Sequence, residues 1–408
     1  MNKELLRKYA QLIVKTGANI KEGQCVVIRT NVALEDFAAL VSEECYKAGA
    51  KRVFVHWQSA KMDKVDYNYA QLDNLCWVPS FEEECHKFMR DELPVLMWLD
   101  GDDPDGLKGV DATIVSRVKS EKFKVVGKYR EERGNKAQWV IAGYPTKEWA
   151  KKVFPELNED QAMDRLLEAI LLTARAADGN GIKNWKEHEI QLKKRCAYLN
   201  SLHLSSLRYK SKTGTDFTVG LIPGVIFQAG GEKTEDGTFF QPNIPSEECF
   251  TTPMKGVAEG VVVASKPLVY QGQVIENFSI RFHQGKAVEV HAEKGEDVLK
   301  SILTLDEGAS YLGEVALVPF DSPINNTGLL FFNTLYDENA ACHLALGRGF
   351  EELYPDYQKY TLDELQDKGI NSSLSHVDFM IGDSYLNIVG IKDNGDEVQI
   401  FKDGNWAF

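Results

Sequence analysis

The sequence predicts an α/β amino-terminal domain, residues 1–180, followed by a mainly antiparallel α+β carboxy-terminal domain, residues 181–408. Apolar strand-like runs alternate with helical patterns in the first part, which is typical of a parallel sheet. The clearest break is the polar segment 178–181 (DGNG), after which apolar residues fall into short alternating runs separated by turn signals. With 408 residues, 43% of them hydrophobic, the chain is long enough to form two cores.

The amino-terminal domain begins with an amphipathic helix, because apolar residues recur at helical spacing from Leu5 to Val14 and stop before Gly17. A strand, a helix and a second strand then form a βαβ unit, which predicts parallel pairing. Neither a glycine-rich dinucleotide motif nor a P-loop motif occurs, so we expect a scaffold here rather than a nucleotide site. The predicted elements after the first helix are strand 24–29, helix 31–46, strand 51–57, strand 94–99 and strand 138–143.

The carboxy-terminal domain is predicted to consist mostly of antiparallel strands. Helix 166–174 precedes the break and helix 184–199 follows it. Turn residues at 282–286 and 392–396 predict two hairpins. The predicted strands are 216–219, 260–264, 278–282 and 286–290.

Charge and cysteine content restrict the classes of partner. A net charge of -14 argues against nucleic acid or an anionic membrane as the main partner, since either requires a basic surface. The seven cysteines contain no C-x-x-C pair, which predicts neither a disulfide framework nor a zinc knuckle. With no signal peptide or apolar run of membrane-spanning length, we expect a cytoplasmic protein.

Acidic side chains stand in apolar surroundings at two places. In an extended segment the adjacent Glu247 and Glu248 point to opposite faces, so one of them can point into a site; the alternative is a solvated pair at the end of a loop. Glu314 interrupts the apolar strand-like run 311–318, where a buried carboxylate requires a cation, a hydrogen-bonding partner or a proton. A structural salt bridge is the alternative.

Two histidines lie beside apolar runs. His343 lies in residues 339–347, a run of small and apolar residues that favours a helix, and Glu338 stands five positions earlier as a candidate ligand or partner of the imidazole. The alternative for His343 is a core histidine. His376 and Asp378 are two apart on a predicted strand, so both point to the same side; a simple hydrogen-bonded or surface pair is the alternative.

These candidates share one chemistry, because carboxylates with a few imidazoles suit divalent cations such as Zn²⁺, Co²⁺, Mn²⁺ or Mg²⁺. Many carboxylates with few histidines favour two ions about 3.5–4 Å apart, with one carboxylate bridging them. Cys249 and Cys342 stand next to candidate ligands but are interpreted as small core residues.

The same segments resemble the thermophilic-type metallo-aminopeptidases, the group that includes aminopeptidase T, aminopeptidase S and PepS. The resemblance covers essentially the whole chain, and it is strongest in residues 243–253 (NIPSEECFTTP) and in the segments around the candidates above. It implies an enzyme that removes amino-terminal residues from peptides with a free amino terminus, using two divalent ions. It also implies an amino-terminal α/β domain and a homodimer.

Carried over residue by residue, the resemblance implies that Glu314 bridges the two ions. The other implied metal ligands are Glu248, Glu338, His343, His376 and Asp378. Glu247, next to one of them, is our candidate for the catalytic general base or proton shuttle. One position departs from the family: Phe350 stands where we expect a tyrosine, so a hydroxyl that would stabilise the reaction's intermediate must come from Tyr354, Tyr357 or a metal ion, or activity is altered.

Other classes of function remain open from the sequence. No G-x-S-x-G or H-E-x-x-H motif occurs, which disfavours a serine hydrolase and a zincin; His188 and Glu189 lack the second histidine. A non-catalytic, metal-stabilised peptide-binding or structural protein is the main alternative, and Phe350 favours it. An unrelated α/β enzyme acting on a nucleotide or sugar rests on the amino-terminal pattern alone.

Overall fold

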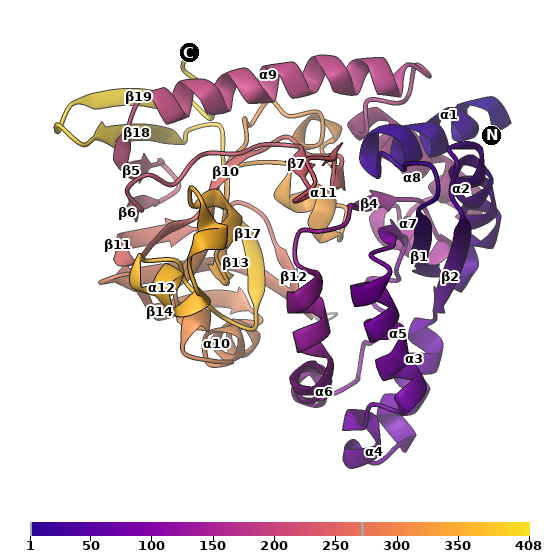
Figure 1. Ribbon diagram of the computed structural model, residues 1–408. Helices are drawn as coiled ribbons and strands as arrows, with labels where there is room; N and C mark the ends of the chain where they lie inside the picture. Colours follow the sequence, from indigo (N-terminus) through magenta and orange to yellow (C-terminus); the bar gives the residue numbers. More distant parts are fainter. Residues whose placement is uncertain (1, 271–272) are drawn as a thin grey trace. The chain divides into compact units, whose positions relative to one another are not determined.

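The computed structural model describes residues 2–270 and 273–408, and Figure 1 labels its helices and strands. The contacts within the chain divide it into two compact units. The first comprises the chain up to Glu187 together with Gly231–Pro245, and the second comprises His188–Gly230 and Ser246–Phe408. Each unit has its own sheet structure, and each is described by itself.

The first unit is built around a parallel sheet of five strands in the order β2-β1-β3-β4-β9. Its first four strands lie within one or two residues of the predicted ones, so the parallel pairing expected from the βαβ pattern is confirmed. The strands are β1 (Cys25–Asn31), β2 (Arg52–Gln58), β3 (Val95–Asp100), β4 (Trp139–Gly143) and β9 (Asn243–Ile244).

Helices connect these strands, as parallel pairing requires. The side chain of Asn2 accepts hydrogen bonds from the first turn of α1, and α2 packs against both α1 and β1 (Figure 1). The helices are α1 (Lys3–Leu12), α2 (Glu35–Lys47), α3 (Ala60–Tyr69), α4 (Leu72–Cys76), α5 (Ser80–Asp91), α6 (Ala112–Arg133), α7 (Lys147–Val153) and α8 (Glu159–Thr173), with a π-helical turn η1 (Ile13–Gly17) and a 3-10 turn η2 (Val32–Leu34).

A short segment returns to the first unit late in the sequence. Residues 231–245 contain the ribbon β7 (Glu232–Lys233) and β8 (Phe239–Phe240), followed by β9. Asn243 pairs in parallel with Ile141 at the edge of the sheet. The long helix α9 (Gly181–Ser201), which covers the predicted helix 184–199, carries the chain from the first unit into the second. None of the described helices combines the length and hydropathy that a bilayer-spanning segment requires.

The second unit contains a large antiparallel sheet, as predicted, with the order β12-β13-β11-β6-β5-β18-β19-β20 and β14 paired to β13. Both predicted hairpins are present, one between β13 and β14 and one between β18 and β19. The strands are β5 (Leu204–Lys210), β6 (Asp216–Leu221), β11 (Pro253–Val263), β12 (Leu268–Tyr270), β13 (Gln273–His283), β14 (Lys286–Lys294), β18 (Asn387–Lys392), β19 (Glu397–Lys402) and β20 (Asn405–Trp406).

A second antiparallel sheet of four strands has the order β10-β15-β16-β17. Apolar side chains from both sheets and from α9 form one hydrophobic cluster, which includes Val315, Leu344 and Phe379 of the smaller sheet. The strands of this sheet are β10 (Cys249–Thr251), β15 (Leu312–Leu317), β16 (His343–Gly347) and β17 (His376–Met380); the helices of the unit are α10 (Glu296–Leu303), α11 (Thr334–Glu338) and α12 (Leu362–Asp367), with 3-10 turns η3 (Gly308–Ser310), η4 (Asn325–Thr327), η5 (Glu351–Leu353) and η6 (Tyr357–Lys359).

Candidate metal centre

One face of the four-stranded sheet carries most of the acidic and imidazole side chains singled out in the sequence. Side chains alternate between the two faces of a strand, and Leu344 and Leu346 of β16 point into the hydrophobic cluster. His343 and Ala345 therefore point to the opposite face. Glu314 and Asp378 both pair with Ala345, one from each side, so the two carboxylates flank its small side chain.

The position of His343 corrects the sequence analysis. The prediction of a helix over residues 339–347 is wrong, because α11 ends at Glu338 and His343 is the first residue of the central strand β16. Alanine and leucine favour a helix, but by less than about 1 kcal/mol per residue, and pairing with β15 and β17 on both sides of β16 overrides that preference.

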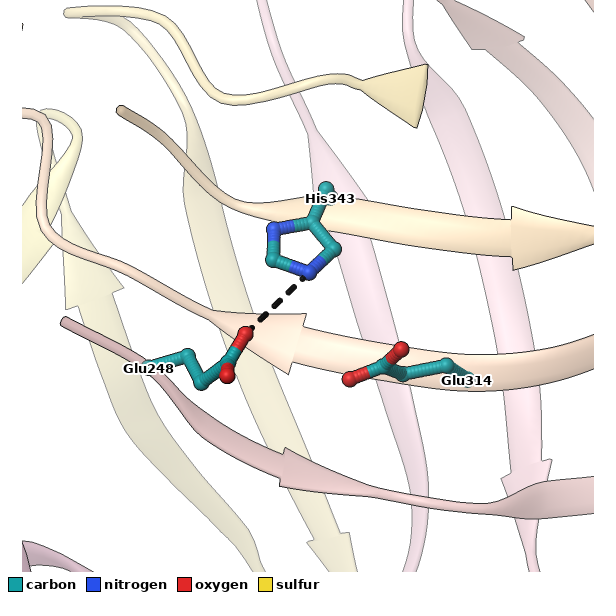
Figure 2. A group of neighbouring side chains, drawn as sticks. All are labelled: Glu248, Glu314 and His343. Carbon is teal, nitrogen blue, oxygen red and sulfur yellow. Dashed lines mark ion pairs between the residues drawn. The ribbon is translucent and has the colours of Figure 1, made fainter. Parts of the chain in front are cut away.

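The first group of donors consists of Glu248, Glu314 and His343, whose donor atoms lie within 4.8 Å of one another. Nε2 of His343 lies 3.4 Å from Oε2 of Glu248, the pair joined by the dashed line in Figure 2. The three side chains point toward a common space, with Glu314 reaching it from the neighbouring strand (Figure 2). All three residues are buried, at 7%, 5% and 1% exposure respectively.

The second group consists of Glu314, His376 and Asp378. Nε2 of His376 lies 3.0 Å from Oε2 of Glu314 and 3.2 Å from Oδ1 of Asp378. The prediction that His376 and Asp378 point to the same side of a strand is confirmed. Glu314 belongs to both groups, so its carboxylate lies where two cation sites would meet.

Both imidazoles are oriented by backbone carbonyl oxygens. Nδ1 of His376 donates to the carbonyl oxygen of Arg348 at 2.8 Å, and Nδ1 of His343 lies 3.3 Å from that of Ala341. Each histidine therefore has its Nε2 turned toward carboxylates. This is the arrangement of metal-ligating histidines, whose second ring nitrogen donates to a carbonyl or carboxylate.

Burial and mutual repulsion keep part of the cluster protonated. Burial raises the pKa of Glu314 to about 7, although its hydrogen bond to His376 opposes the shift. Burial and the charges of Asp378 and Glu248 raise the pKa of Glu338 well above its usual value. Burial alone would lower the pKa of His343, but the hydrogen bond to Glu248 and the charge of Glu314 outweigh it and raise the pKa to about 10. The cluster therefore binds protons where a cation would fit.

Glu338 lies beside the two groups without belonging to either. It is the last residue of α11, and its Oε1 lies 3.4 Å from Nδ2 of Asn339. Its carboxylate interacts electrostatically with Asp378, Glu248 and His343. The structure thus brings all the predicted ligands to one region of the second unit.

Glu247 and Glu248 have different imidazole partners. Glu247 is buried at 3% exposure, and its Oε2 lies 3.7 Å from Nε2 of His188 on α9. Its backbone N–H donates to Oδ1 of Asn339 at 2.8 Å. Glu248 instead lies next to His343, and Glu247 belongs to neither donor group.

The donor set fits divalent cations. Among residues 2–270 and 273–408, the ion pairs of Glu248, Glu314 and Asp378 are with histidines only, so no lysine or arginine neutralises them. Buried carboxylates without such a partner require a metal ion or protons. Neither Cys249 nor Cys342 belongs to either donor group. Burial raises the pKa of the Cys342 thiol to about 12 and that of Cys249 well above its usual value, as is typical of core residues.

Phe350 lies beside the second donor group. Its ring is 5.3 Å from the imidazole of His376 and 5.2 Å from the ring of Phe250, centroid to centroid. The family resemblance implies a tyrosine at this position. The structure places an aromatic ring without a hydroxyl against a candidate metal ligand.

Three further residues escaped the sequence analysis as parts of the site. Asn339 was noticed only as part of the misassigned helix, and His188 only for lacking the second histidine of a zincin. Ser246 donates from Oγ to Oε1 of Glu248 at 3.3 Å. Single polar residues of this kind have no spacing that reveals a partner far away in the sequence. The polar segment Ser246–Glu247–Glu248 (the S-E-E segment) is buried in the structure, but the sequence alone does not show that burial.

A paired set of acid and imidazole donors on one buried sheet face defines a divalent-metal enzyme as the candidate class, and comparisons with known proteins agree. A family model described as thermophilic metalloprotease (M29) matches residues 2–406. Aminopeptidase AmpS of Bacillus subtilis is 38% identical over 404 residues, covering 99% of this chain and 98% of that protein. Aminopeptidase T of Thermus thermophilus is 36% identical over 406 residues and 99% of both chains.

A solved structure, described as wild-type AmpT from Thermus thermophilus, matches with a TM-score of 0.91 at 36% identity, covering 100% of both chains. The chain therefore belongs to the thermophilic metalloprotease (M29) family, which confirms the resemblance found in the sequence. It is a metal-dependent hydrolase of that family.

Proposed function

We propose that this protein is a two-metal aminopeptidase that removes amino-terminal residues from peptides with a free amino terminus. The observation that carries the proposal is the position of Glu314, whose carboxylate belongs to two donor groups at once. Burial raises the pKa of Glu314 to about 7, so in the metal-free protein this carboxylate retains a proton where a cation would bind. The relatives named above are aminopeptidases.

In this proposal the residues would hold two ions drawn from Zn²⁺, Co²⁺, Mn²⁺ and Mg²⁺, and Glu314, which belongs to both donor groups, would contribute to both sites. Glu248 and His343 would hold one ion and His376 and Asp378 the other, with Glu338 as the remaining ligand. When bound, the ions supply Lewis-acid activation of a water molecule and of the peptide carbonyl group. The remaining chemistry falls to side chains that move protons and orient the peptide.

Glu247 is the proposed general base or proton shuttle. A buried carboxylate next to a metal ligand can take a proton from the attacking water and pass it to the leaving amine. Its 3.7 Å approach to His188 offers a neighbour that can stabilise the charged form. Carboxylates in excess of those needed for the ions can pair with the substrate's free α-amino group, which would select amino-terminal residues.

The family resemblance implies a homodimer, and the acidic composition and scattered cysteines are typical of a cytoplasmic protein. We propose a cytoplasmic homodimer in which residues 1–180 are a scaffold domain and residues 181–408 are the metal-binding catalytic domain. Neither nucleic acid nor a membrane is expected as a partner, because the net charge of -14 disfavours both.

The proposal is tested with the purified full-length protein, stripped of metal by a chelator and then supplied with each of the four cations separately. Release of the chromophore from an aminoacyl chromogenic amide is expected only when a cation is present. The same amide with its amino group acetylated is the matched control, and it should remain intact. Cleavage of the acetylated amide would contradict an amino-terminal exopeptidase.

A second candidate function is a non-catalytic, metal-stabilised peptide-binding or structural protein. The absence of a hydroxyl at Phe350, next to His376, is the observation that favours it. In that case the metal-loaded protein would melt at a higher temperature than the stripped protein and would release no chromophore with any cation. Metal-dependent release eliminates this candidate.

A further inference from the structure

Asn339 lies between two of the segments that carry candidate ligands. It is fully buried, at 0% exposure, and directly follows Glu338 at the end of α11. Its Oδ1 accepts a hydrogen bond from the backbone N–H of Glu247 at 2.8 Å, and its Nδ2 donates to the carbonyl oxygen of Leu335 at 3.0 Å. These two partners fix the orientation of the amide, since one is a donor and the other an acceptor.

The same amide nitrogen reaches a candidate ligand. Nδ2 of Asn339 lies 3.4 Å from Oε1 of Glu338, so one side chain contacts both the S-E-E segment and the carboxylate of α11. Glu247 and Glu248 are adjacent in the chain, and a shift of the Glu247 backbone therefore moves Glu248. The amide links the positions of two carboxylates that are far apart in the sequence.

The S-E-E segment is also held from its other side. Nε2 of His188, on α9, lies 2.8 Å from the carbonyl oxygen of Ser246, and Oγ of Ser246 contacts Glu248. Asn339 and His188 thus hydrogen-bond to the backbone of two consecutive residues, Glu247 and Ser246. Because β10 begins only at Cys249, the carboxylate-bearing residues before it lack strand hydrogen bonds and depend on side chains for their position.

We propose that Asn339 is a positioning residue of the metal centre. It holds Glu248 and Glu338 in the relative positions that allow both to bind the same cation cluster. This inference rests on the proposed two-metal function. Asn339 itself is not a ligand; it acts through the two glutamates. Partners that orient metal ligands typically affect metal affinity or activity by about 10–100-fold when removed.

The test uses full-length, metal-free protein carrying Asn339→Ala, with Mn²⁺ or Co²⁺ titrated by calorimetry. The matched control is Asn200→Ala, because Asn200 also makes a pair of backbone hydrogen bonds, accepting from Phe227 N–H at 2.7 Å and donating to its carbonyl oxygen at 3.0 Å, and within the described part of the chain hydrogen-bonds to no candidate ligand. Asn339→Ala should bind metal about 10–100-fold more weakly than the wild type. Asn200→Ala should keep the wild-type metal affinity.

Unfolding of each metal-free variant is measured in parallel, since a purely structural asparagine would lower the melting temperature and leave metal affinity unchanged. Equal metal affinity in Asn339→Ala and wild type would overturn the inference while leaving the two-metal function intact. Failure of the wild type itself to bind metal would instead overturn the proposed function. If the alanine variant does not fold, Asn339→Ser, which keeps a hydrogen-bonding group at the site, replaces it and is judged by the same comparison.

Discussion

Glu314 shows at the scale of one residue how a buried carboxylate can be unfavourable for the metal-free protein and useful for function. It lies on a strand whose other residues are apolar, at 5% exposure. Transfer of a charged carboxylate into such an environment is costly unless a cation accompanies it. Because of that cost, burial raises the pKa of Glu314, and the carboxylate retains its proton at a higher pH than an exposed glutamate does.

Replacement of Glu314 by glutamine should therefore separate stability from activity. We expect Glu314→Gln to lose measurable turnover, since neutral glutamine cannot bridge two cations. The metal-free variant should unfold at or above the wild-type temperature, because a buried ionisable group has been removed. Glu307→Gln, at an exposed glutamate of the same unit, is the control. A Glu314→Gln enzyme with near-normal rates would remove the bridging role.

Phe350 permits the opposite kind of experiment, in which a group is added. Its ring lies 5.3 Å from that of His376, so a phenol at this position would bring a hydroxyl to the edge of the metal centre. If the chain lacks a hydroxyl that assists the reaction, Phe350→Tyr should raise kcat by about 10-fold or more, with little change in KM. An unchanged kcat would show that Tyr354, Tyr357 or the ions already supply this function.

At the scale of secondary-structure elements, strand register builds the centre. Glu314, Ala345 and Asp378 form one row across three neighbouring strands, and His343 and His376 occupy positions two residues away on the same face. The small side chain of Ala345 leaves space between the two carboxylates. A wider residue there would compete with an ion for that space.

This arrangement predicts the effect of Ala345→Val. Valine suits a strand, but its added methyl groups would occupy space that an ion needs. An overpacking cost of about 1–3 kcal/mol in the metal-bound state would weaken metal binding by roughly 5- to 150-fold. Leu344→Val, which points into the hydrophobic cluster on the other face, should lower thermal stability and leave metal affinity intact. Calorimetric titration of both variants decides the point. Equal metal affinities would show that Ala345 does not line the ion site.

The strands also show what could be predicted from the sequence. The apolar run around Glu314 and the H-x-D pattern at His376 were sufficient to predict the two strands that carry these residues, because side-chain alternation within a strand is a local property. His343 was assigned to a helix, since small residues followed by leucine carry no strand signal on their own. Its strand exists because β15 and β17 lie on either side of it, and that information is not local.

At the scale of the whole molecule, proton binding and metal binding compete. The pKa of Glu314 is about 7 when folded against 4.5 ordinarily, and that of His343 is about 10 against 6.5. For both groups the folded state retains a proton that the unfolded state has lost, so the stability of the metal-free protein falls as pH rises between these values. Asp378, whose pKa is lowered, acts in the opposite direction only at more acidic pH.

Metal ions displace these protons, so the rise in melting temperature on adding Mn²⁺ should be larger at about pH 8.5 than at about pH 5.5. Thermal unfolding of the same sample at both values, with and without metal, measures the difference. Gln variants of exposed glutamates should show the wild-type pattern. A metal-induced shift that is the same at both pH values would contradict competition with protons in the cluster.

The sequence predicted the parallel sheet, the antiparallel sheet and the family, because each depends on patterns or motifs spread over many residues. It could not place residues 231–245, whose two-residue strand β9 pairs with β4 in the first unit. A strand that short has no periodicity. The same holds for Asn339 and His188, whose roles depend on partners brought near by the fold.

The most direct test of the account is anomalous X-ray scattering from crystals of the wild-type protein grown with Mn²⁺ or Co²⁺. We expect two ions, one bound by Glu248 and His343 and the other by His376 and Asp378, with Glu314 coordinating both. A single ion without Glu314 among its ligands, or ions bound elsewhere on the chain, would contradict this expectation.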